Sequence, residues 1–323
     1  MTDCPPELVE RFRAELERLT VRSADRIGLA VSGGPDSLAL LLLAHAAYAG
    51  RVQAATVDHQ LRPESGAEAD EVARICRDLD VPHRTLTASV SRAGAGLQAA
   101  AREARYAALA SWMRDEGLSL LLTGHHADDQ AETLLMRLLR GSGVSGLAGI
   151  RPSRPLPEAG PDARLCRPLL DWRRSELTEI VRVAGLQAAD DPSNRNEAFD
   201  RTRIRLSLDD APWLDSAFLA RSAALLAEAE QALEWTAGRL FEERTQLQAE
   251  VLTFDPSGLP PELLRRLTLR CLKQVDPTAA PRGAELDTFV SALSSGGVST
   301  LARVRGQGGP AWRFETTPPR RPS

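Results

Sequence analysis

The chain has 323 residues, enough for two domains, and 43% of them are hydrophobic, so a substantial core can form. A net charge of −4 gives no sign of a generally basic nucleic-acid-binding protein. The charge is uneven, however, because residues 137–205 hold 13 Arg against nine Asp or Glu, a local surplus of +4. This surplus suits an anionic partner and an ordinary solvated surface equally well.

The cysteines and the apolar segments exclude several classes of protein. The four cysteines are far apart in the sequence, so they form no CxxC redox or metal pair: Cys4, Cys76, Cys166 and Cys271. The N-terminus is acidic and polar, unlike a signal peptide, and the apolar run at 38–47 is too short to cross a bilayer. We therefore expect a cytoplasmic protein that makes no membrane contact.

An amphipathic helix is predicted at 6–19, and it leads into a buried strand at 27–31, the loop S-G-G-P-D-S and an apolar helix from Leu38. This order predicts a phosphate cradle, because glycines let the backbone approach an anion and free N–H groups at a helix start point towards it. Asp36 can hold a magnesium ion on the phosphates. The loop lacks Gly-Lys-Ser/Thr and is therefore no Walker P-loop. The candidate phosphate-binding residues are Ser32, Gly33, Gly34, Pro35, Asp36 and Ser37.

Strands and helices alternate through the next hundred residues. Strands are expected at 52–57, 83–87 and 118–123, and helices at 64–79 and 98–116. The alternation predicts an α/β fold with a doubly wound, mostly parallel sheet. Asp58 and His59 come directly after the second strand, where open α/β sheets place their ligands.

The fourth strand runs into a segment rich in ionisable side chains, T-G-H-H-A-D-D-Q-A-E-T. On a helix starting here, His125, Asp129 and Glu132 would share one face. Such a face can bind a metal, accept a proton or hold an amine. A purely structural interpretation, in which Asp128 and Asp129 only favour the positive end of the helix dipole, leaves the two histidines and Glu132 unexplained.

The basic middle of the chain is predicted to be less regular. Residues 151–168 are rich in Pro and Arg and indicate a loop, and 190–195 indicate a turn. Arg201, Arg203 and Arg205 alternate, so an extended segment would present them on one side, ready for phosphates. A solvated segment with internal ion pairs explains the same pattern equally well.

A linker at 207–216 precedes a smaller C-terminal domain, which we expect to be mainly helical. Helices are predicted at 217–248, 260–274 and 284–293, and short strands at 300–304 and 311–316. This part shows no catalytic constellation. We therefore predict a catalytic domain at 1–212 and a C-terminal binding or accessory domain at 213–323.

Several motifs together resemble a known family. S-G-G-P-D-S resembles the pyrophosphate loop of the N-type ATP pyrophosphatases. The stretch TGHHADDQAETLLMRLLRGSG with the following GLAGI, and the later DDPSNRNEAFDRTRIR, resemble the tRNA(Ile)-lysidine synthetases in particular. VDHQLR and AREARY also fit that family. The resemblance covers residues 26–206, whereas the C-terminal third matches only weakly.

The resemblance implies an ATP-dependent ligation of L-lysine to C2 of the wobble cytidine of a CAU-anticodon tRNA(Ile), through an adenylated tRNA. It implies ATP and Mg²⁺, the latter on Asp36. The catalytic candidates are Asp36, His125, His126, Asp129 and Glu132. The ATP-binding candidates are the six loop residues, Asp58 and His59. The tRNA-binding candidates are Arg105, Arg140, Arg195, Arg201, Arg203 and Arg205.

Some questions stay open at this stage. The proton acceptor can be His125, His126 or Asp129, and Asp129 or Glu132 can instead bind the lysine ammonium. The oligomeric state is also open, a homodimer being one option. The alternatives are a tRNA thiolase of the same superfamily, a non-catalytic RNA-binding module and a metal hydrolase. The isolated cysteines argue against the thiolase, and the S-G-G-P-D-S loop is unexplained in the hydrolase.

Overall fold

The computed structural model describes residues 4–20, 26–60, 65–88, 97–189, 200–211 and 213–317. The chain divides into two compact units between residues 227 and 228, within the continuous helix α9 (Ser216–Arg244). Linker composition had instead placed our predicted boundary after residue 212. Among the described residues, no helix is both long and apolar enough to cross a membrane.

The first unit is built on a six-stranded sheet of order β3-β2-β1-β4-β6-β5. Its strands are β1 (Ile27–Ala30), β2 (Val52–Asp58), β3 (His83–Thr87), β4 (Leu120–Thr123), β5 (Ser153–Pro155) and β6 (Arg164–Cys166). All neighbours are parallel except β5, which pairs antiparallel with β6. The predicted doubly wound, mostly parallel sheet is confirmed. The strand order reverses between β1 and β4, which is where such sheets bind ligands.

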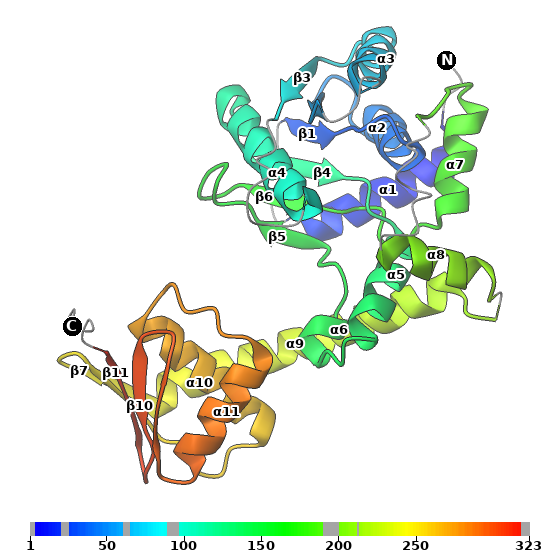
Figure 1. The fold of residues 1–323 in the computed structure, drawn as a ribbon. Coiled ribbons are helices and arrows are strands. Elements are labelled where there is room, and N and C mark those ends of the chain that lie inside the picture. The colour runs from blue at the N-terminus through cyan, green and yellow to red at the C-terminus, as the bar shows by residue number, and fades with distance from the viewer. Residues whose placement is uncertain are drawn as a thin grey trace. The chain divides into compact units, whose positions relative to one another are not determined.

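Helices cover both faces of this sheet (Figure 1). One core contains side chains from α1 (Pro6–Leu19), α2 (Pro35–Ala47), α3 (Ser65–Asp78) and α7 (Arg174–Val183), and the other is built on α4 (Leu97–Glu116). Strand residues alternate between the two, since Leu120 and Leu122 join the first core and Leu121 the second. Helix α2 is buried from Ser37 to Ala44, which explains its continuous apolar sequence.

The region predicted as a loop at 151–168 contains the edge strand β5 and its neighbour β6, so that prediction was wrong in part. Each strand has only three residues, too few for a clear period-2 pattern. Pairing of β6 with the buried β4 stabilises both. The remaining helices of the first unit are α5 (Ala127–Leu138), α6 (Val144–Leu147) and α8 (Asp200–Asp209).

The second unit combines helices with an antiparallel sheet of order β7-β8-β11-β10-β9. Its elements after α9 are β7 (Thr245–Gln248), β8 (Val251–Phe254), α10 (Pro261–Val275), α11 (Gly283–Ser294), β9 (Val298–Leu301), β10 (Val304–Gln307) and β11 (Trp312–Thr316). The expected helices and the last strand are present. The single strand expected at 300–304 is instead split between the end of β9 and the start of β10, which are joined by a hairpin turn in which Ala302 and Arg303 have φ values of 48° and 58°.

Candidate active site

The S-G-G-P-D-S loop lies between the end of β1 and the first turn of α2. Gly33 has a φ of +88°, a backbone conformation that favours glycine. Pro35 occupies the first helical turn, where its missing N–H costs nothing. The Ser37 hydroxyl accepts a hydrogen bond from Ser32 N at 3.1 Å and donates to Gly34 O at 3.0 Å. These bonds hold the loop open around a helix start that no side chain caps.

Gly124 brings the second motif, which follows β4, against this loop. A Cβ atom at Gly124 would lie 2.8 Å from the Asp36 carbonyl oxygen, so only glycine allows this approach. Helix α5 then begins at Ala127, whose N–H donates to Trp172 O at 2.8 Å. Asp36 and the histidine pair therefore meet at the carboxyl edge of the sheet. Gly124 could not be singled out from local sequence, because its role depends on a distance between two loops.

His126 is buried and surrounded by carboxylates. Its Nε2 lies 3.4 Å from Asp36 Oδ2 and 3.6 Å from Asp129 Oδ2, and its Nδ1 lies 3.5 Å from Asp128 Oδ2. Burial alone would lower the pKa of His126, but hydrogen bonding to Asp128 and Asp36 and the charge of Asp129 outweigh burial and raise that pKa to about 10. His126 is therefore an imidazolium at neutral pH. Asp36, Asp128 and Asp129 are hereafter the carboxylate cluster.

His125, the preceding residue, has the opposite environment. Its Nδ1 lies 3.0 Å from Thr123 Oγ1. Burial lowers the pKa of His125 to about 3, and the positive charges of Arg167 and Arg105 act in the same direction, against the carboxylate of Asp129. His125 is therefore neutral at pH 7. Because it precedes α5, the shared helix face that we predicted for it is wrong, whereas Asp129 and Glu132 are on the helix.

Asp128 connects the histidine to two other elements. Its Oδ2 accepts a hydrogen bond from Arg174 N at the start of α7, at 2.9 Å, and its Oδ1 accepts one from Ser216 Oγ at the start of α9, at 3.0 Å. Burial works against ionisation of Asp128, but hydrogen bonding to His126 and to the Arg174 backbone lowers its pKa well below the usual range. The role of Asp128 could not be predicted from local sequence, because its hydrogen-bond partners are 46 and 88 residues away.

Glu132 is 1% exposed and pairs with two arginines of α8. Its Oε1 lies 2.7 Å from Arg205 Nε, and its Oε2 lies 3.0 Å from Arg201 Nε. Burial raises the pKa of Glu132 even though both arginines act against that rise. The extended segment that we predicted for 201–205 is wrong, because a helix places Arg201 and Arg205 on one face and exposed Arg203 on another.

The other predicted site residues are placed unevenly. Asp58 is the last residue of β2 and His59 follows it, and burial and the charge of Arg105 lower the pKa of His59. Arg140 is exposed beyond the far end of α5, and 13 residues of helix from Ala127 correspond to roughly 20 Å. The structure therefore does not bring Arg140 to the carboxylate cluster. Arg195 lies outside the described residues.

Asp36 and its neighbours could hold a magnesium ion only together with the phosphate groups of a bound substrate. In the described part of the chain, no group of three or more His, Cys, Asp or Glu side chains is placed to bind a metal. Asp36 Oδ1 is nevertheless buried without a hydrogen-bond partner. Mg²⁺ is commonly bound by one or two carboxylates together with substrate phosphates, so Asp36 beside a phosphate cradle fits this ion.

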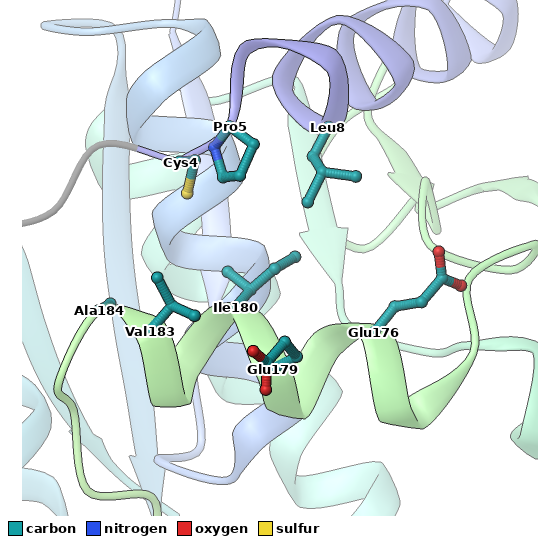
Figure 2. A pocket seen from close by; sticks show the side chains of 8 residues that line it. All are labelled: Cys4, Pro5, Leu8, Glu176, Glu179, Ile180, Val183 and Ala184. Atoms are coloured by element: carbon teal, nitrogen blue, oxygen red, sulfur yellow. The ribbon is translucent and has the colours of Figure 1, made fainter.

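A cavity of about 210 Å³ lies elsewhere, between the start of α1 and helix α7. Figure 2 shows Cys4, Pro5 and Leu8 facing Ile180 and Val183 across it. None of the predicted site residues lines this cavity. The cavity is separate from the candidate active site, which lies at the carboxyl ends of β1 and β4.

Comparison with known proteins agrees with these features. A family model described as a PP-loop domain matches residues 8–211. The chain is 47% identical to the tRNA(Ile)-lysidine synthase of Zymomonas mobilis, over 92% of this chain and 90% of that one. It belongs to the tRNA(Ile)-lysidine synthase family. The family that we inferred by resemblance is thus confirmed.

Two further comparisons mark the limits of the family. The tRNA(Ile)-lysidine synthase of Novosphingobium aromaticivorans is 46% identical, over 96% of this chain and 94% of that one. Among solved structures, the U34-tRNA thiolase NcsA of Methanococcus maripaludis has a TM-score of 0.57 at 18% identity, covering 69% of this chain and 79% of that one. At this low identity the likeness to the thiolase shows a shared fold and nothing about the roles of individual residues.

Proposed function

We propose that this enzyme of the PP-loop family joins lysine to C2 of the wobble cytidine of a CAU-anticodon tRNA(Ile), consuming ATP. In the first step the C2 oxygen attacks the α-phosphate of ATP, and pyrophosphate leaves. In the second step the lysine ε-amine attacks C2, and AMP leaves with the oxygen. The observation that carries this proposal is the contact of the phosphate cradle with the His126 motif through Gly124, in a chain of this family.

The phosphate groups of ATP would bind at the start of α2. The free N–H groups of the first helical turn and the Ser32 hydroxyl are available to them, and the helix dipole favours negative charge there. Asp36 Oδ1 would hold Mg²⁺, which when bound offsets the charge that develops on the departing pyrophosphate. The His126 imidazolium, 3.4 Å from Asp36, adds a second positive charge at the same place.

The structure favours different tasks for the two histidines. His126 already carries a proton at neutral pH, so it cannot accept another. His125 is neutral and can accept one, although its low pKa makes it a weak base. We therefore propose that His125 takes a proton released when the lysine amine attacks, after the attack has made the amine acidic. Asp129, whose pKa is lowered by His126 against the effect of burial, would first hold the lysine ammonium. The ammonium releases one proton to water to give the free amine that attacks C2, and His125 then takes the second proton, which the attack has made acidic.

The arginines of α8 are proposed to act in two ways. Arg201 and Arg205 neutralise Glu132 and hold α8 against α5. Exposed Arg203 is the member of the series that faces away from Glu132, and we propose that it contacts tRNA phosphate. Tests of Arg105, Arg140 and Arg195 as tRNA-binding residues require the same salt-dependent binding measurement.

The cysteines give no support to the thiolase alternative. Three of the four are buried, and burial raises the pKa of Cys76 to about 12 and also raises that of Cys166. A thiol with a raised pKa is a poor nucleophile at neutral pH. Sulfur transfer through these residues would therefore be slow.

The direct test supplies purified protein with ATP, Mg²⁺ and labelled lysine. Label should enter the isoleucine acceptor with a CAU anticodon and not the initiator methionine tRNA, which shares that anticodon. A hundredfold preference requires only about 2.7 kcal/mol, and contacts outside the anticodon must supply it. Sulfur incorporation from cysteine would instead support the thiolase, and tRNA binding without ATP cleavage would support the non-catalytic module.

Two attributes extend the proposal. ATP and tRNA are cytoplasmic, so we propose the same location for the enzyme. A homodimer stays a prediction, which sedimentation of the full chain can test. The role of residues 228–323 in choosing the tRNA is likewise a proposal, since this unit provides the surface beyond the first unit.

A further inference from the structure

Four arginines from three elements surround one tyrosine near the site. The guanidinium carbons of Arg102, Arg105 and Arg154 lie 5.1, 5.3 and 5.0 Å from the centre of the Tyr106 ring. Arg167, which directly follows β6, is 3% exposed and is the fourth member. Arg102 and Arg105 are on α4, and Arg154 is on β5. These four residues are hereafter the arginine cluster.

The arginine cluster lacks negative charge. Within the described ranges, no carboxylate lies within ion-pair distance of any of its four guanidinium groups. The Nε atoms of Arg105 and Arg167 are buried without a hydrogen-bond partner, and Arg167 Nη1 donates to the Arg151 carbonyl at 2.6 Å. Arg105 and Arg167 also hydrogen-bond with the Tyr106 hydroxyl, which is a neutral group at pH 7. Cations buried without a counter-charge are costly, so a site of this kind favours an anionic ligand.

The neighbouring groups respond to this surplus. Burial lowers the pKa of both Arg105 and Arg167. Burial would raise the pKa of Tyr106, but the charges of Arg102, Arg105 and Arg167 outweigh it and lower that pKa. The cationic charge therefore persists despite burial, and it is focused on a small volume.

The position of the arginine cluster relates it to the reacting nucleotide. The charge of Arg105 acts on His59, after β2, and on His125, after β4, and the charge of Arg167 also acts on His125. The cluster thus adjoins the part of the site formed by the residues that follow β2 and β4. The phosphate cradle for ATP follows β1 and has its own N–H donors.

We propose that the arginine cluster binds a backbone phosphodiester of the RNA next to the nucleotide that is modified. This proposal rests on the proposed function, which makes an RNA the substrate. Guanidinium groups match phosphate oxygens in geometry and charge. The triphosphate of ATP has the same chemistry, but the cradle at α2 already provides for it. Tyr106 serves to hold three guanidinium groups together, because cations stack on its ring.

The first experiment measures tRNA binding at several salt concentrations with Arg102→Gln, Arg154→Gln and the double variant. Loss of one phosphate contact from single-stranded RNA should lower the slope of log affinity against log salt by about 0.7. We expect the double variant to bind tRNA about tenfold more weakly and ATP within twofold of the wild type. Arg182→Gln, an equal charge change at the exposed pair with Glu179, is the matched control and should change neither.

The outcomes separate the sources of phosphate. A weaker affinity for ATP with an unchanged tRNA slope would assign the arginine cluster to the nucleotide and overturn the proposal. An unchanged slope and affinity for both ligands would overturn it as well. Failure of the wild type to incorporate lysine would refute the proposed function but would leave these binding measurements informative.

A second measurement avoids changing any arginine. The chain has two tyrosines, so Tyr48→Phe leaves Tyr106 as the single phenol. Ionisation of Tyr106 is then followed by near-ultraviolet absorbance, with and without tRNA. Bound phosphate should neutralise the neighbouring arginines and raise the midpoint by about one pH unit. A midpoint that tRNA does not move would contradict the proposal.

Discussion

His125 and His126 are consecutive residues in opposite environments. His126 lies among the carboxylate cluster and has a pKa raised to about 10, whereas burial, with the charges of Arg167 and Arg105 in the same direction, lowers the pKa of His125 to about 3. The loop between β4 and α5 therefore separates the anionic side of the site, formed by the carboxylate cluster, from the cationic side, formed by the arginine cluster. Because the two side chains are identical, the difference in their charge states comes from the fold around each of them.

This difference matches the two kinds of substrate. The anionic side can hold cations, namely Mg²⁺ on Asp36 and the lysine ammonium on Asp129. The cationic side can hold the phosphates of RNA. Such a separation places an amine and a nucleotide on either side of the atoms that must react. Variants that remove one side while preserving the other can test it.

The largest effect is expected from Asp36→Asn, which removes the proposed metal ligand but keeps the shape of the side chain. We predict at least a hundredfold loss of tRNA-dependent pyrophosphate release, because the charge on the leaving group is no longer offset. The affinity for tRNA should stay within twofold, because the arginine cluster is intact. Pyrophosphate release near the wild-type rate would show that Asp36 does not organise the phosphates.

A smaller loss is expected from Glu132→Gln, which leaves Arg201 and Arg205 without their buried counter-charge. We predict a loss of about 2–3 kcal/mol in the free energy of unfolding, measured with urea. Glu179→Gln, which breaks an exposed pair with Arg182, is the control and should leave stability nearly unchanged. Equal stability of the two variants would mean that the Glu132 pairs contribute no more than a surface pair.

The smallest effect is the pH dependence of stability. The folded pKa of His126 is above its unfolded value, so its contribution is complete below about pH 6.5 and is lost as pH rises through 10. The folded pKa of His125 is below its unfolded value, so below about pH 6.5 the unfolded chain takes up a proton that the folded protein does not. The stability of the fold therefore falls as pH falls from about 6.5 towards 3. His126→Gln should therefore cost roughly 2 kcal/mol at pH 7 and less at pH 10.

His125→Gln should show the reverse trend and reduce sensitivity to acid. Urea unfolding at a series of pH values checks both variants. Parallel stability curves for the two variants would mean that their environments do not differ as described.

Much of the first unit could be predicted from the sequence, because local patterns determine it. Strands β1, β2 and β4 have apolar runs, and the S-G-G-P-D-S loop has a recognisable order of strand, glycine turn and helix. The motif after β4 identified the acidic side of the site for the same reason. These features depend on neighbouring residues and on a period of two or 3.6.

The rest depends on contacts between distant residues. Strands β5 and β6 are too short to show a pattern, so the positions of Arg154 and Arg167 could not be predicted from local sequence. Gly124 matters because of its distance to Asp36, 88 residues earlier in the chain. Arg201, Arg203 and Arg205 alternate in the sequence as in a strand, yet they lie on a helix, from which Arg201 and Arg205 pair with Glu132.

The most direct test of the division between the two sides is a nuclear magnetic resonance titration of the histidine rings. The chain has five histidines, and the variants His125→Gln and His126→Gln assign the two signals. We predict that His126 remains protonated at pH 8 and that His125 remains neutral at pH 5. Titration of both rings with midpoints near 6.5 would contradict the division of the site into an anionic and a cationic side.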